Sequence, residues 1–137
     1  MPNVHVTAER WRDPQYAAAF YVFSRMRFSD KRRACFARVE SAGIDKAGLL
    51  EDARAWSHGE RVLVKIALDL FDPGCVAAAG HAPAGWGEAA NVLDRENMDT
   101  ALAALRLARQ ETRMVEVRTL EDGRIEARLE SRGRFEV

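Results

Sequence analysis

The sequence predicts an α+β fold that is mostly helical, with four to five helices packed round a central helix at residues 57–71 and a β-hairpin at residues 113–130. Two observations lead to this prediction. Apolar residues recur at helical spacing through most of the chain, and the period changes from 3.6 to 2 after Gln110. The length of 137 residues suits a single globular domain, residues 1–137, with one core.

The N-terminal elements are predicted from local start signals. Residues 3–8 alternate weakly between apolar and polar, which predicts a short strand or an ordered arm. Asp13 followed by Pro14 is typical of a helix start, and the aromatic-rich segment QYAAAFYVFSRM after it predicts a largely buried helix. Ser29-Asp30 predicts the cap of a second helix that ends near Gly43.

The second predicted helix has an apolar face and a basic one. Cys35, Val39 and Ala42 fall on the apolar face, with Phe36 alongside. The arginines of this segment lie elsewhere on the helix and are expected to reach water; they are Arg32, Arg33 and Arg38.

The middle of the chain predicts a third helix and then the central one. Asp45 is a cap for the segment KAGLLEDARAW. Ser57 and Glu60 form the pattern S-x-x-E, a capping box in which each side chain accepts a hydrogen bond from the other residue's backbone N–H. The helix that follows is apolar over much of its surface, so we expect it at the centre of the fold. Asp72-Pro73-Gly74 ends it.

Residues 73–87, PGCVAAAGHAPAGWG, predict a long Gly/Ala/Pro loop, because they hold no charged side chain and are rich in helix breakers. A connection of this length within a small domain is typical of a functional or a disordered loop. Trp86 at its end is a candidate exposed anchor. Asp94 then caps a fifth helix.

The segment after Gln110 predicts two strands and a tail, residues 113–137, with Gly123 in the hairpin turn. Val115 and Val117 are expected on one face of the hairpin, and Met114 and Glu116 on the other. One face would then pack on the helices and the other would be charged, with Arg–Glu pairs across the strands.

Composition excludes several classes of function. Lys and Arg together number 21, as do Asp and Glu, so no overall field attracts the chain to nucleic acid or to a membrane. Residues 1–50 hold nine basic and five acidic side chains, whereas residues 51–100 hold four and nine. No signal peptide and no membrane-spanning run is visible, and the two cysteines have no metal-ligand spacing, so we expect a cytoplasmic protein with free thiols.

The sequence signals for three kinds of chemistry are incomplete. The segment SHGE, residues 57–60, resembles the signature segment of ABC-type ATPases, but the phosphate loop that such an enzyme requires is absent from the chain. The histidines form no metal-binding pattern, so we predict no metal site and no cofactor. Cys75 with His81 is the candidate pair for a nucleophilic enzyme, and Cys35 is expected to be a buried apolar residue.

The strongest candidate for binding is the basic turn, residues 25–33, with the sequence RMRFSDKRR. We expect it to be exposed between two helices, where it can meet an acidic protein surface, a second copy of the chain, or phosphate groups. The predicted partner-binding residues are Arg25, Arg27, Lys31, Arg32, Arg33 and Trp86.

The sequence therefore favours a small, non-enzymatic binding or accessory module that acts through protein–protein contacts. Its Arg- and Ala-rich composition is typical of bacterial or phage genomes. The unpaired edge of the hairpin is a further place for a partner strand or a second copy. A nucleic-acid-contacting protein that uses the basic turn is the first alternative, and a small enzyme that uses Cys75 and His81 is the second.

Overall fold

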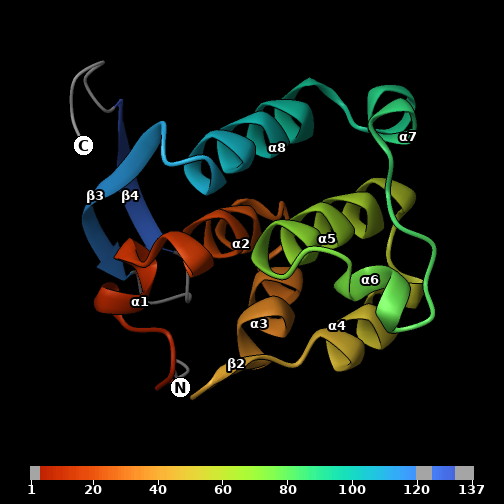
Figure 1. Cartoon of the computed structure of the whole chain (residues 1–137), viewed down its shortest axis with the longest axis horizontal. Coiled ribbons are helices and arrows are strands. Elements are labelled where there is room, and N and C mark those ends of the chain that lie inside the picture. The colour runs from red at the N-terminus through yellow and green to blue at the C-terminus, as the bar shows by residue number, and fades with distance from the viewer. Residues whose placement is uncertain (1–3, 120–124, 132–137) are drawn as a thin grey trace.

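A computed structural model of the chain describes residues 4–119 and 125–131, and it confirms the predicted class, α+β and mostly helical with a C-terminal two-stranded antiparallel sheet (Figure 1). None of the helices in this described part is both long enough and apolar enough to cross a membrane. The helices are α1 (Ala8–Arg12), α2 (Pro14–Arg25), α3 (Ser29–Ala37), α4 (Lys46–Asp52), α5 (His58–Phe71), α6 (Cys75–Ala78), α7 (Trp86–Val92) and α8 (Arg95–Ala108). The strands are β1 (Val39–Glu40), β2 (Gly43–Ile44), β3 (Thr112–Thr119) and β4 (Ile125–Ser131).

Three helices, α2, α5 and α8, form the body of the fold, and each packs against the other two. Helix α5 buries most of its apolar side chains, as the sequence predicts. Helix α2 is equally central, because it also contacts α1 and α3. Its run Ala17–Ala19 is buried, as are Ala101 and Ala104 of α8, and side chains this small let two helices approach closely.

Helix α1 was not predicted; it begins at Ala8, the last residue of the segment 3–8 that the sequence predicted as a short strand or an ordered arm. Thr7 caps it by accepting a hydrogen bond from the backbone N–H of Arg10, at 3.3 Å. Trp11 of this short helix is 1% exposed, so the helix is part of the core. Residues 4–7 form a turn and no strand, so for the described part of segment 3–8 the strand alternative is wrong. The cap at Thr7 and the buried indole of Trp11 stabilise the helical turn that follows.

Helix α3 ends earlier than predicted. It stops at Ala37, and Val39–Glu40 then pairs with Gly43–Ile44 in a very short antiparallel sheet. Val39 is buried and Ala42 is exposed, whereas the predicted helix had both on one buried face. The guanidinium of Arg10 donates to the carbonyls of Glu40, at 2.6 Å, and of Gly43, at 3.5 Å, so a side chain distant in sequence holds this turn.

The predicted caps at Asp13, Asp45, Ser57 and Asp94 are confirmed. Both halves of the capping box are present: Glu60 N donates to Ser57 Oγ at 3.3 Å, and Ser57 N donates to Glu60 Oε1 at 3.0 Å. At α3 the N-cap is Phe28, which makes no side-chain cap bond, so the predicted cap at Ser29-Asp30 is wrong.

The segment 73–87 is not a loop throughout. Residues 75–78 form the single helical turn α6, and Trp86 begins α7, which the sequence did not predict. The α6 turn is held by Asp69, whose Oδ1 accepts from the backbone N–H of Val76 at 3.4 Å. Helix α7 is attached to the start of α5 by a contact of 2.8 Å between His58 Nε2 and Glu88 Oε2.

The side chains of the hairpin do not alternate regularly between the two faces of the sheet, because β3 contains a bulge. The register shifts between Val115, which pairs with Arg128, and Arg118, which pairs with Glu126. Glu116 has a φ of 55°, in the left-handed region, and the extra residue reverses which side chains face the helices. Met114 is therefore buried and Val117 packs against the core, so the predicted faces are wrong for Met114. The predicted turn at Gly123 lies outside the described residues.

The two serines at the starts of α5 and α3 give the first testable prediction. Ser57→Ala should lower the free energy of unfolding by about 1 kcal/mol, because a backbone N–H at the helix start loses its acceptor. Ser29→Ala should change it little, since Ser29 makes no cap bond. Urea denaturation of the two variants checks this, and equal losses would contradict the assignment of the caps.

Candidate partner-binding surface

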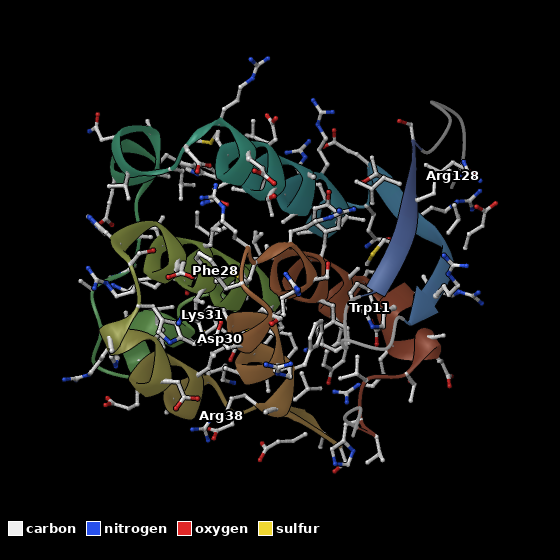
Figure 2. All side chains as sticks on the ribbon, turned by 180° about the vertical axis from the view of Figure 1, so that it is seen from behind. Trp11, Phe28, Asp30, Lys31, Arg38 and Arg128 are labelled. Carbon is white, nitrogen blue, oxygen red and sulfur yellow. The ribbon has the colours of Figure 1, made fainter. Side chains whose placement is uncertain are left out.

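The basic turn between α2 and α3 is exposed only in part. Arg25, Arg27 and Arg33 are exposed, as expected, and so is Phe28, at 57%. Figure 2 shows Phe28, Asp30 and Lys31 close together on this turn. Phe28 is therefore an exposed apolar ring within a turn that also carries exposed arginines.

Arg32 does not reach water, which corrects the prediction. It is 9% exposed, and its Nη1 donates to the carbonyls of Met26, at 2.7 Å, and Arg27, at 3.0 Å. Both carbonyls lie just beyond the end of α2, where helical partners are missing. Arg32 thus fixes the path of the turn and presents Phe28 outward, rather than offering its own charge to a partner.

Two other cations of the turn are already paired. Arg27 Nη2 lies 3.2 Å from Asp94 Oδ2 and 3.9 Å from Glu96 Oε2, at the start of α8. Lys31 Nζ lies 3.2 Å from Asp30 Oδ2, and this hydrogen bond lowers the pKa of the Asp30 carboxyl. The turn is consequently a surface of mixed charge and not a patch of free positive charge.

A cavity of about 230 Å³ lies beside Phe28. Its walls come from the turn, from the start of α5 and from the start of α8, and they include Arg27, Ser57, Glu60 and Asp94. Glu60 uses Oε1 in the capping box, while its Oε2 is buried and has no hydrogen-bond partner among residues 4–119 and 125–131. A buried carboxylate oxygen without a donor is costly, so Glu60 Oε2 is an unsatisfied acceptor near the start of α5.

Trp86 is exposed, at 52%, as the sequence predicts for an anchor. It stands on the first turn of α7, whereas the cavity is reached by Val92 at the last turn of the same helix. Trp86 is therefore not part of the cavity wall. It stands at the opposite end of α7 from Val92, which does line the cavity.

The candidate nucleophile Cys75 is buried, at 7% exposed. Its Sγ donates to the carbonyl of Leu68 at 3.3 Å, and burial, followed by the charges of Asp69 and Asp72, raises the pKa of the thiol to about 11. His81 Nε2 instead lies 3.6 Å from Glu51 Oε1. Burial also raises the pKa of the Cys35 thiol. In the part of the chain that the structure describes, no three His, Cys, Asp or Glu side chains are grouped to hold a metal ion.

A second cavity, of about 290 Å³, was not predicted. It lies between Trp11, the end of α8 and β3. Two polar atoms in its walls, Trp11 Nε1 and Thr112 Oγ1, are buried without a hydrogen-bond partner among the described residues. Gln110 and Glu116, at φ of 60° and 55°, also line it. The bulge and the buried indole that create it depend on contacts between distant segments, for which the sequence carries no local signal.

Comparison with models of protein families, with curated proteins and with solved structures found no match for the chain.

The buried arginine provides a second prediction. Arg32→Met should lower the free energy of unfolding by about 2 kcal/mol, because two buried carbonyls lose a charged donor. Arg33→Met, one residue further along the same helix, should change it by less than about 0.5 kcal/mol because Arg33 is exposed. Thermal and denaturant unfolding of the two variants provide the measurement, and a stable Arg32→Met protein would show that the carbonyls need no donor.

A third prediction concerns Cys75. In the native protein at neutral pH, iodoacetamide should modify Cys75 at least about a hundredfold more slowly than a peptide thiol, because the raised pKa leaves little thiolate. Peptide mass spectrometry after timed alkylation distinguishes Cys75 from Cys35, and the denatured protein is the control. Fast modification of Cys75 would restore the Cys75–His81 alternative.

Proposed function

We propose that the protein is a non-enzymatic binding module of bacterial or phage type, which acts in the cytoplasm through protein–protein contacts at the turn between α2 and α3. The observation that carries the proposal is Phe28, which is 57% exposed and lines a cavity between the turn and the starts of α5 and α8. The predicted residues Arg25, Arg27 and Arg33 of the same turn are also exposed.

The composition of this surface suits a protein partner. Aromatic and arginine side chains are enriched among the residues that contribute most to protein–protein affinity. Trp86, also exposed, offers a second anchor on the adjoining helix.

The nucleic-acid alternative has less support. Affinity for a polyanion grows with the number of phosphates that free cations neutralise. Of the five predicted cations, Arg32 is buried, and Arg27 and Lys31 face carboxylates. The acidic side chains at the start of α8 would repel phosphates that approach Arg27.

Partner capture followed by affinity measurement tests the proposal. The immobilised wild-type protein should retain a specific protein from cells of the native host, and mass spectrometry would identify it. With that protein purified, Phe28→Ala should raise the dissociation constant by about tenfold or more, because a central aromatic anchor is removed.

Leu102→Ala is the matched control, since Leu102 is an exposed apolar residue, at 45%, on α8 and outside the cavity. It should leave the affinity unchanged. Equal binding by wild type, Phe28→Ala and Trp86→Ala would overturn the proposal. Binding of DNA or RNA that falls steeply with salt and is lost in Arg33→Ala would favour the nucleic-acid alternative instead.

A further inference from the structure

The cavity of about 290 Å³ between α1, the end of α8 and β3 plays no part in the partner-binding proposal. Figure 1 shows the short helix α1 beside the hairpin, and α1 contacts β3. An apolar cavity of about 150 Å³ is large enough to hold a benzene molecule, and pockets for small ligands begin at about 300 Å³. The cavity therefore has room for one small organic molecule.

Two residues with left-handed backbone conformation line this cavity. Helix α8 ends in a turn in which Gln110 N donates to the carbonyl of Leu107 at 3.0 Å, and Gln110 has a φ of 60° at a position where glycine is usual. Glu116, with a φ of 55°, lies at the bulge of β3. Residues other than glycine in this conformation are found more often at ligand sites than elsewhere.

The buried part of the cavity wall is apolar but includes one donor without a partner. Its buried residues are Trp11, Ala17, Leu107 and Met114. Trp11 is 1% exposed, and its Nε1 has no acceptor among residues 4–119 and 125–131. A buried donor without a partner is costly and rare in folded proteins. An indole N–H donates and does not accept, so the missing partner is a hydrogen-bond acceptor.

The exposed part of the wall supplies the charges. Arg113 Nη2 lies 2.6 Å from Glu130 Oε1, and Glu116 Oε1 lies 3.3 Å from Arg128 Nη2, so these wall charges are paired within the hairpin. Arg12 is exposed and has no ion-pair partner in the described part of the chain. A single unpaired cation suits a ligand with one negative charge, because a second charge would be repelled by Glu116 without a cation to balance it.

We propose that this cavity binds a small carboxylic acid, whose carboxylate accepts hydrogen bonds from the indole N–H of Trp11 and from the guanidinium of Arg12. The two donors are neighbours at the end of α1. A carboxylate has two acceptor oxygens and forms strong hydrogen bonds with guanidinium groups. A ring or a short apolar chain on the acid would then lie against Ala17, Leu107 and Met114, where it is removed from water.

Other classes of small molecule fit this wall less well. An amine would bring a second positive charge toward Arg12 and would offer the indole N–H no acceptor. Inorganic phosphate carries up to two negative charges and has no apolar part to cover the buried wall. A neutral apolar molecule would fill the space but would leave Trp11 Nε1 without a partner.

An NMR titration tests the proposal. The proton–nitrogen spectrum contains one indole signal for each tryptophan, Trp11, Trp56 and Trp86, and the signals lost in Trp56→Phe and in Trp86→Phe identify the third as Trp11. Benzoate, phenylacetate and hexanoate are the probes. At least one of them should shift the Trp11 signal to a saturating value and leave the other two signals in place. Phenethylamine, which carries an ammonium group in place of the carboxylate of an acid, should not shift it.

A pair of arginine variants separates binding by charge from filling of the cavity. Arg12→Gln should raise the dissociation constant of the acid that binds by about tenfold, because a charged donor is removed. Arg95→Gln, at an exposed arginine outside the cavity wall, is the matched control and should leave the constant unchanged. Circular dichroism checks that both variants fold. The comparison of acids with the amine needs only the wild-type chain, so it decides the question if Arg12→Gln does not fold.

The proposal is overturned if none of the three acids shifts the Trp11 signal, or if the amine shifts it as the acids do. Equal affinity of Arg12→Gln and the wild type for the acid would also overturn it. Binding of the acid goes beyond the partner-binding proposal and fails or succeeds separately from it. Phe28 does not line this cavity, so Phe28→Ala should bind the acid as the wild type does.

Discussion

The cluster of aromatic rings around Phe20 is the interaction on which the rest of the structure depends. Phe20 is fully buried, and its ring centroid lies 5.2 Å from that of Trp11, 5.4 Å from Tyr16 and 5.8 Å from Phe36. These contacts bind α1 and α3 to α2, and the contact of Tyr16 with Phe71, at 5.1 Å, adds the end of α5. Large rings bury much apolar surface and prefer defined tilts, so the cluster fixes how these helices meet.

That arrangement determines what the turn between α2 and α3 can expose. With Phe20, Phe23 and Phe36 directed into the core, the short connection passes over the outside of the cluster. Its carbonyls at Met26 and Arg27 then need a donor, which Arg32 supplies from the first turns of α3. Phe28 lies on this connection and is 57% exposed. The exposed anchor is thus a consequence of core packing and of one buried charge.

The sequence predicts what depends on neighbours along the chain. Ser57 with Glu60, Asp13 and Asp94 act as caps because a helix start needs acceptors within three residues, and that requirement is visible in the sequence. Arg32 and Arg33 are the same residue type at adjacent positions, yet Arg32 is buried and Arg33 is exposed. Which of the two is buried depends on where the end of α2 lies, and the sequence of α3 does not show that. The bulge at Glu116 likewise reverses the faces of β3 through pairing with β4, which no residue of β3 alone signals. The exposure of the turn that contains Phe28 is predicted from the sequence, whereas the burial of Arg32 within the same turn depends on the packed structure.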